Sequence, residues 1–295
     1  MSFREEIMPQ IQNFAKVSFF KISHFTKHSI QPRPFIKWAG GKTQLLPELL
    51  SRIPKKFDTY FEPFLGGGAL FFALKPEKAV LSDKNFELIN AYLVIRDSVE
   101  ELIQSLKKHK NTREYFYYMR KLNPEELSPV ERASRFIYLN KTCYNGLWRV
   151  NSKGEFNVPY GRYKNPKICD EDNLRMVSKI LQGKIILCCD FEEAVEKAKS
   201  GDFIYFDPPY YPLSETSCFT SYTEEGFGAE EQKRLSKVFK ELDRRGCFVL
   251  LSNSDSEFVK SLYEGYNITV VKANRFINCI GERRKGITEL LISNY

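Results

Sequence analysis

The chain has 295 residues, a formal net charge of +8 and a sequence pI near 9.0. This length suffices for one large hydrophobic core with an inserted module. The positive charge suits a polyanionic partner, and no segment approaches the ~18 consecutive apolar residues of a membrane helix. We therefore expect a soluble protein with no membrane partner and no signal peptide.

The cysteine and histidine content argues against a disulfide-stabilised or metal-binding protein. The chain has seven cysteines, none in a C-x-x-C spacing, and three histidines. The cysteine pattern indicates reduced thiols in a cytosolic protein. The histidines lie outside every motif described below, so we expect no metal site.

The first motif is a glycine turn at residues 35–43, which contains Lys42. The turn resembles the end of a phosphate-binding P-loop, but the leading glycine of that motif falls on Ile36, which disfavours a nucleoside triphosphatase. Lys42 can instead pair with a carboxylate, and the neighbouring Trp38 ring can support a sulfonium cation. Both groups occur in S-adenosylmethionine.

A second glycine turn, at residues 60–72, follows an expected strand and allows a ligand to approach the backbone closely. The third glycine of a dinucleotide fingerprint is replaced by Phe71, which disfavours pyrophosphate binding. The next expected strand ends at Asp83, an acid placed to accept two ribose hydroxyls. These features favour a nucleoside, with an ordinary βα turn as the alternative.

Residues 86–138 show helical spacing and precede a glycine- and asparagine-punctuated hairpin around residues 151–154. Basic residues cluster at 141–167 and again at 272–285, next to aromatic side chains. Such clusters are typical of a surface that grips duplex DNA with stacking side chains. We expect the insertion to recognise the target.

The most informative segment is a tetrapeptide at the end of an apolar run that predicts a strand buried on both faces. It reads Asp207, Pro208, Pro209 and Tyr210. Because prolines donate no backbone hydrogen bond, we expect the Pro208 and Pro209 carbonyls to stand free as acceptors beside the Asp207 carboxylate. A strand-ending turn is the alternative.

Methyl transfer to an exocyclic amino group of a base fits this tetrapeptide. Such a nitrogen is a poor nucleophile because its lone pair is delocalised into the ring. The Asp207 carboxylate and the Pro208 carbonyl can accept both N–H bonds and localise the lone pair. Tyr210 would stack on a base that has left the duplex.

The remaining elements complete an α/β pattern. Residues 211–228 predict a long loop over the active site, and residues 230–242 an amphipathic helix that serves only the core. Further strands are expected at residues 184–189, which we expect to be buried, and at residues 247–252 and 268–271. The strands and helices predict one doubly wound sheet.

With these motifs the chain resembles the DNA adenine-N6 methyltransferases, and most closely the Dam-type enzymes that methylate GATC. The resemblance runs from about residue 35 to residue 292. It includes four separated motifs in the family's order: residues 37–42, residues 62–68, a middle block at 138–149 and 154–162, and residues 207–210.

The resemblance implies a role for individual residues. The catalytic motif is matched by Asp207, Pro208, Pro209 and Tyr210. Contacts to S-adenosyl-L-methionine are implied for Trp38, Lys42, Glu62, Phe64, Asp83, Asp207 and the segment Asp190-Phe191 beside the cofactor's adenine. Contacts to DNA are implied for Lys37 at the first base pair, for Tyr144, Asn145, Leu147 and Arg149 in a hairpin that enters the duplex, and for Asn157 and Arg162 at backbone phosphates.

The fold expected from the resemblance is a Rossmann-like methyltransferase sheet with an inserted helical and hairpin target-recognition domain. The expected divisions are an N-terminal extension at 1–34, a catalytic domain at 35–88 and 180–295, and a target-recognition domain at 89–179. The expected partner is double-stranded DNA, bound by a monomer without a metal ion. The expected setting is the nucleoid in the cytoplasm of a bacterial or phage-infected cell.

Two other functions compete with this one. An RNA or protein-glutamine methyltransferase can carry a similar catalytic tetrapeptide, and a catalytically silent DNA-binding regulator can retain the fold. The basic hairpin favours duplex DNA, and intact Lys42 and Asp207 favour an active enzyme. A solitary regulatory enzyme and one half of a restriction-modification system have the same sequence features.

Overall fold

The computed structural model describes residues 31–212, 227–273 and 287–295, and its contacts group residues 32–295 into one compact unit. The features predicted for residues 1–30, most of the loop at 211–228 and most of the basic cluster at 272–285 lie outside the described residues. The description below concerns residues 32–295.

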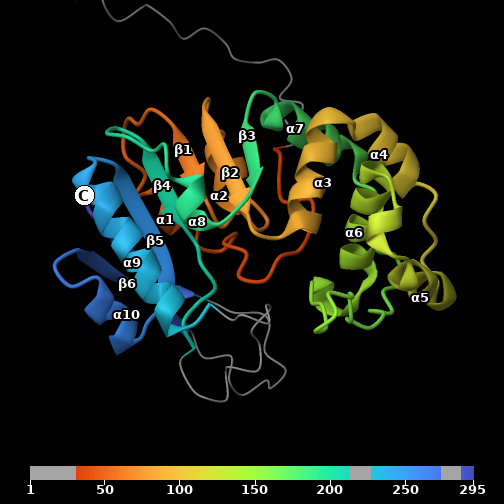
Figure 1. Cartoon of the computed structure of the whole chain (residues 1–295). Coiled ribbons are helices and arrows are strands. Elements are labelled where there is room, and N and C mark those ends of the chain that lie inside the picture. The colour runs from red at the N-terminus through yellow and green to blue at the C-terminus, as the bar shows by residue number, and fades with distance from the viewer. Residues whose placement is uncertain (1–30, 213–226, 274–286) are drawn as a thin grey trace, which may run out of the picture. The chain divides into compact units, whose positions relative to one another are not determined.

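A seven-stranded mixed sheet forms the centre of this unit (Figure 1). Its order is β3-β2-β1-β4-β5-β7-β6, in which the first five strands are parallel and β7 runs antiparallel to both of its neighbours. The strands are β1 (Tyr60–Glu62), β2 (Ala79–Asp83), β3 (Ile185–Cys188), β4 (Phe203–Phe206), β5 (Phe248–Ser254), β6 (Asn267–Ala273) and β7 (Ile287–Ser293). The predicted doubly wound, Rossmann-like methyltransferase sheet is confirmed.

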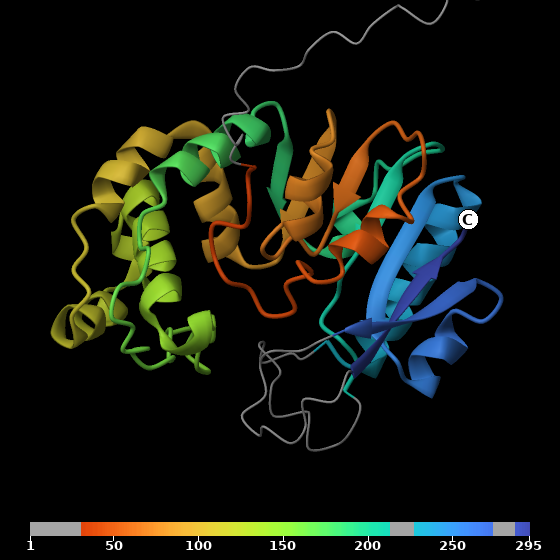
Figure 2. The ribbon, with the colours of Figure 1, turned by 180° about the vertical axis from the view of Figure 1, so that it is seen from behind.

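Helices cover both faces of the sheet. Figure 2 shows α1 and α2 on one face, and Figure 1 shows α8 and α9 on the other. The helices outside residues 86–181 are α1 (Leu46–Leu50), α2 (Ala69–Leu74), α8 (Phe191–Ala194), α9 (Ala229–Arg244) and α10 (Glu257–Leu262). The other helices are α3 (Phe86–Asp97), α4 (Val99–Leu106), α5 (Arg113–Lys121), η1 (Pro124–Glu126), α6 (Pro129–Thr142), η2 (Tyr144–Gly146) and α7 (Glu171–Leu181).

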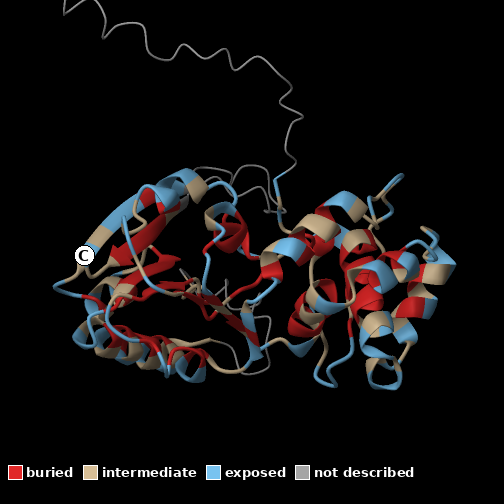
Figure 3. Ribbon diagram, turned by 90° about the horizontal axis from the view of Figure 1, so that it is seen from above, coloured by how far each residue is buried: buried red, intermediate tan, exposed pale blue. Residues whose placement is uncertain are grey.

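Strand β4 shows why the sheet needs cover on both sides. All four of its residues are buried, and successive side chains point to opposite faces. Phe203 and Tyr205 join the hydrophobic cluster that includes α2 and α3, whereas Ile204 and Phe206 join the cluster that includes α9. Figure 3 shows this burial along the strands. The strand therefore ends at a fixed position between two packed layers.

The expectation of a buried strand at residues 184–189 is wrong. Strand β3 lies at an edge of the sheet, paired only with β2 among the described strands. Ile185 is 54% exposed and Leu187 is 37% exposed. A continuous apolar run indicates a strand but does not tell an edge strand from a central one.

The insertion is helical, as its sequence spacing predicts. Helix α6 packs against α3 and α4, and a capping box between Ser128 and Glu131 fixes its start. His109 is bonded through its two ring nitrogens to Tyr115 and Ser134, and burial lowers its pKa to about 4. This histidine therefore belongs to the core of the module.

The segment after α6 is less regular than the predicted hairpin. It contains isolated antiparallel bridges, Cys143 with Tyr160 and Val150 with Phe156, and a turn in which the Gly154 amide donates to the Asn151 carbonyl. No helix in the described ranges is long and apolar enough to cross a membrane.

Candidate active site

The predicted catalytic residues lie where the sheet order reverses. Strands β1 and β4 are neighbours at the centre, and the chain builds outward from them in opposite directions. In open α/β sheets, ligands bind at the carboxyl ends of strands at such a switch point. Glu62 ends β1 and Asp207 follows β4, so the two central motifs meet there.

Lys42 joins the first glycine turn to the catalytic tetrapeptide. Its Nζ lies 2.7 Å from Asp207 Oδ1, donates to the Gly40 carbonyl at 2.7 Å and lies 4.7 Å from the Tyr210 ring centroid. The Lys42 side chain is only 7% exposed, so little solvent screens these interactions. The structure thus brings three predicted site residues into one charged cluster.

The Pro209 carbonyl is engaged, contrary to the expectation that both proline carbonyls stand free. It accepts a hydrogen bond of 3.0 Å from Gln232 Nε2, and Gln232 Oε1 accepts from Asn253 Nδ2 at 2.9 Å. Asn253 Oδ1 also accepts from the Tyr211 amide. This network of buried amides holds the end of the tetrapeptide.

The same contact corrects the interpretation of residues 230–242 as a helix that serves only the core. Gln232 lies on α9, is fully buried and donates a hydrogen bond to the Pro209 carbonyl. Gln232 is a polar residue on the inward face of an amphipathic helix. This position could have indicated the contact, because buried polar side chains need hydrogen-bond partners.

Glu289 is a further residue that the sequence reasoning missed. Its Oε2 accepts a hydrogen bond of 2.7 Å from the Tyr210 hydroxyl, and the residue is only 5% exposed. Burial and the nearby Asp207 and Glu289 carboxylates raise the pKa of Tyr210 well above its usual value, so the phenol stays protonated. In the sequence, Glu289 is an acid within the otherwise largely apolar strand β7, a pattern that indicates a buried carboxyl with a hydrogen-bond partner.

The second glycine turn packs against Trp38 and is held by Asp83. Gly66 has a φ of +47°, and a Cβ there would lie 2.6 Å from Trp38 Cδ1, so only glycine fits. The Gly66 amide donates to Asp83 Oδ2 at 3.0 Å, and the Asn85 amide donates to Asp83 Oδ1 at 3.0 Å. Burial raises the pKa of Asp83, although these two amide bonds oppose the rise.

Glu62 ends strand β1 just before this turn, and the pKa of its carboxyl is raised. Burial raises its pKa from 4.5 to about 8, the hydrogen bond of 2.9 Å from the Tyr60 hydroxyl opposes the rise, and the Asp207 charge adds to it. The carboxyl is therefore mostly protonated at neutral pH. A cationic ligand beside it would favour the charged form.

An aromatic pair lies next to the carboxyl end of β3. The Phe64 and Phe191 rings stack with centroids 5.4 Å apart. Asp190 caps α8, and its carboxylate pairs with Lys84 at 3.1 Å and with Arg234. The Arg234 guanidinium lies 4.3 Å from the Phe191 ring centroid. This apolar pair with an adjacent carboxylate suits a flat heterocycle that carries an amino group.

Six of the seven predicted DNA-binding residues lie on η2 and the segment after it, and the seventh, Lys37, lies in the first glycine turn. Tyr144 is 48% exposed, and Asn145 adopts a left-handed conformation with φ of +55°. Leu147 is half-buried and packs on the cluster around Phe116. An exposed aromatic ring on a turn is suited to insertion between bases.

Two residues with different predicted DNA contacts touch each other. Arg149 Nε donates to the side-chain Oδ1 of Asn157 at 2.7 Å, and the backbone amide of Asn157 donates to the backbone carbonyl of Arg149 at 3.0 Å. Arg162 is exposed, has a φ of +56° and lies outside this pair. Lys37 is exposed, and its Nζ is 5.4 Å from the Tyr163 ring centroid.

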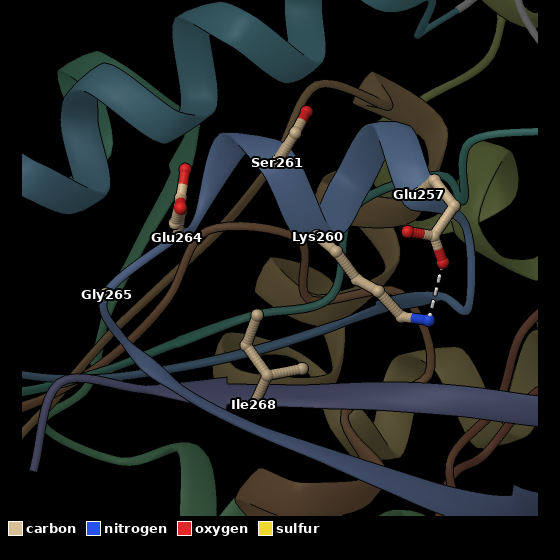
Figure 4. A pocket seen from close by; sticks show the side chains of 6 residues that line it. All are labelled: Glu257, Lys260, Ser261, Glu264, Gly265 and Ile268. Atoms are coloured by element: carbon tan, nitrogen blue, oxygen red, sulfur yellow. Dashed lines mark hydrogen bonds and ion pairs between the residues drawn. The ribbon is translucent and has the colours of Figure 1, made fainter.

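A surface pocket of about 410 Å³ lies apart from all these residues. It is formed by α10 and the start of β6 (Figure 4) and is lined by Glu257, Lys260, Ser261, Glu264, Gly265 and Ile268. Lys260 pairs there with Glu257 at 2.9 Å. Its lining includes no predicted site residue. Within the described residues, no group of three or more His, Cys, Asp or Glu side chains could hold a metal ion.

Comparison with known proteins identifies a family. The sequence profile of the D12 class of N6 adenine-specific DNA methyltransferases matches residues 38–277. The chain is 50% identical to the type II methyltransferase M1.LlaDCHI of Lactococcus lactis subsp. cremoris, over 91% of this chain and 98% of that protein. It is 48% identical to the type II methyltransferase M.MjaIII of Methanocaldococcus jannaschii, over 90% of this chain and 100% of that protein.

Proteins named DNA adenine methylase are also similar. The chain is 38% identical to that of Haemophilus influenzae over 90% of this chain and 96% of that protein. It is 35% identical to that of Escherichia coli K12 over 88% of this chain and 94% of that protein. The family expected from the four motifs is confirmed.

Proposed function

The chain belongs to the D12 class of N6 adenine-specific DNA methyltransferases, and we propose that it methylates a flipped-out adenine within GATC, with S-adenosylmethionine as the methyl donor. Methylation of adenine in DNA is the activity of the family. The cofactor, the flipping of the base and the target sequence are the proposed refinements.

The observation that carries the proposal is the cluster of Lys42, Asp207 and Tyr210 at the end of β4. The Asp207 carboxylate and the Pro208 carbonyl each accept one N–H of the target amine and localise its lone pair. The Tyr210 ring stacks on the base, and its hydrogen bond to Glu289 fixes the ring. Positioned acceptors of this kind act by orientation and electrostatics.

The residues around the two glycine turns fit S-adenosylmethionine. Lys42 supplies an ammonium for the carboxylate of the cofactor, and Trp38 supplies a ring face for its sulfonium. Asp83 keeps lone pairs for ribose hydroxyls while it accepts its two amide bonds. Phe64 and Phe191 supply an apolar site for the adenine, with Asp190 next to it. When bound, the cofactor supplies an electrophilic methyl group.

The exposed turn after α6 supports the choice of duplex DNA. Tyr144 is exposed on η2 and can enter the base stack, Leu147 follows it half-buried, and Arg149 is exposed close by in the chain. Arginine matches the O6 and N7 atoms of guanine bidentately in the major groove. We propose that Lys37 contacts the first base pair and that Asn157 and Arg162 contact phosphates. The enzyme would act as a monomer on DNA in the cytoplasm.

Transfer of tritium from methyl-labelled S-adenosylmethionine tests these refinements. We expect incorporation into a duplex with GATC and at least about fivefold less into each single-base variant, because a bidentate base contact discriminates by ~1–3 kcal/mol. RNA and protein acceptors in parallel reactions should stay unlabelled. Equal labelling of all duplexes would overturn the proposed target sequence, and EDTA-sensitive labelling restored by a divalent ion would show a metal requirement.

A further inference from the structure

Asn140 is a buried amide that joins the first glycine turn to the DNA-binding turn. Its Oδ1 accepts from the Lys37 amide at 2.9 Å, and its Nδ2 donates to the Lys37 carbonyl at 2.8 Å and to the Gly146 carbonyl at 2.9 Å. Asn140 is fully buried in the last turn of α6. One side chain thus holds two segments that lie far apart in the sequence.

The two segments also touch each other directly. Gly146 has a φ of +66°, and a Cβ at this position would lie 2.6 Å from Lys37 Cδ. A side chain at Gly146 would therefore push the segments apart. The close contact and the three hydrogen bonds of Asn140 make one joint between them.

Each segment leads to a different part of the proposed site. Beyond Lys37 the chain continues through Trp38 to Lys42, which is paired with Asp207. Beyond Gly146 it continues to Leu147 and Arg149 in the DNA-binding segment. Separation of the second segment from Asn140 would leave the buried Gly146 carbonyl without this donor, which costs about 1–3 kcal/mol. Separation of the first segment would break both hydrogen bonds between Asn140 and the Lys37 backbone. The two segments are therefore expected to move together.

We propose that Asn140 is a positioning residue that couples cofactor binding to DNA binding. The inference rests on the proposed function, because it assigns the cofactor to the first segment and DNA to the second. A ligand that fixes one segment fixes the other through Asn140, so each ligand strengthens the binding of the other. Such coupling is reciprocal, because both orders of binding reach the same ternary complex.

Asn173 provides a matched control. It is a buried asparagine on α7 that makes the same pair of bonds to the backbone of an adjoining stretch: Oδ1 accepts from the Arg33 amide and Nδ2 donates to the Arg33 carbonyl, both at 3.0 Å. It has no hydrogen bond to η2 among the described residues. Loss of Asn173 therefore loosens the N-terminal stretch without breaking the joint to Gly146.

The test measures the dissociation constant of sinefungin, an analogue of S-adenosylmethionine with no transferable methyl, by calorimetry with and without a GATC duplex. The ratio of the two constants is the coupling factor. We expect a wild-type factor within the usual range of about 5- to 150-fold. Asn140→Ala should lower it at least about fivefold, whereas Asn173→Ala should retain it.

Gly146→Ala breaks the same joint from the other side and should also lower the factor, so it carries the test if Asn140→Ala does not fold. A wild-type factor near one, an unchanged factor in the folded variants at the joint, or an equal loss in Asn173→Ala would overturn the inference. Failure of the wild-type protein to bind sinefungin at all would instead overturn the proposed cofactor.

Discussion

The Lys42 ammonium lies 2.7 Å from the Asp207 carboxylate and 4.7 Å from the Tyr210 ring centroid. The first glycine turn and the tetrapeptide at residues 207–210 are therefore linked electrostatically. A change at Lys42 is expected to affect both cofactor binding and the orientation of Asp207, whereas a change at Asp207 should affect mainly the chemical step.

Asp207→Ala should reduce methylation by ~10² or more, because loss of a positioned catalytic group usually costs that much. Duplex binding should stay within about threefold of wild type, since the residues proposed to bind DNA lie on other segments. Single-turnover methylation and fluorescence anisotropy measure the two effects. Asp207→Asn keeps the shape and one acceptor but lacks the charge. Retention of more than a tenth of the wild-type rate in Asp207→Ala would contradict the catalytic role.

Lys42→Ala and Asp83→Ala should each raise the dissociation constant for the cofactor, by about tenfold or more for the loss of a charge-assisted hydrogen bond. Asp83→Ala should also lower the melting temperature, because Asp83 accepts from the Gly66 and Asn85 amides. Calorimetric titration with sinefungin measures the affinity. Lys55→Ala, at an exposed lysine outside the site, is the control. Unchanged titrations in both site variants would remove these residues from the cofactor site.

Glu289→Ala should lower the methylation rate by about tenfold while cofactor affinity stays constant, because a hydrogen bond to a charged acceptor contributes about 1.5–3 kcal/mol. The carboxylate orients the Tyr210 ring through the 2.7 Å bond. Tyr210→Phe removes the same bond and keeps the ring. If the bond is the cause, the double variant should be no slower than Glu289→Ala alone. Additive losses in the double variant would assign Glu289 a different role.

The sequence predicts those parts of the site that are contiguous in the chain. The glycine turns and the tetrapeptide at Asp207 carry their chemistry in neighbouring residues, and the alternation of strands and helices predicts the doubly wound sheet. Partners that meet only after folding were missed. Gln232 and Glu289 come from a helix and a strand that follow the tetrapeptide, and nothing local shows that they contact it.

The sequence also did not predict that strand β3 would be partly exposed. The run that forms β3 is as apolar as that of β4, but β4 has two neighbouring strands and β3 has one among the described strands. The position of a strand in a sheet depends on the order of all strands, which periodicity does not specify.

The acidity of Glu62 predicts a dependence of stability on pH. Its pKa is 4.5 in the unfolded chain and about 8 in the folded protein. Between these values the folded state keeps a proton that the unfolded state has released, so the free energy of unfolding falls as pH rises through this window and levels off above it. Glu62→Gln removes this contribution. Its melting temperature relative to wild type should therefore rise between pH 5 and pH 8. A constant difference across these pH values would show that Glu62 is ionised in the folded protein.

Arg149→Ala should relax the preference for guanine at one base pair more than it weakens overall binding. Arg149 Nε is held by Asn157 Oδ1 at 2.7 Å, which fixes the plane of the guanidinium while its two terminal nitrogens can still donate. A bidentate arginine–guanine pair discriminates by ~1–3 kcal/mol, so the ratio of methylation rates between GATC and the variant at that base pair should fall by about 5- to 150-fold.

A phosphate contact by Arg149 would behave differently. Affinity would fall about equally for every sequence, and the dependence of binding on salt would become shallower by about one released ion. Arg162→Ala is the matched comparison, because Arg162 is an exposed arginine of the same segment with a predicted phosphate contact. Methylation rates on GATC and its single-base variants, measured for wild type and both arginine variants, separate base reading from phosphate binding. Equal losses on all duplexes in Arg149→Ala would rule out guanine recognition by this residue.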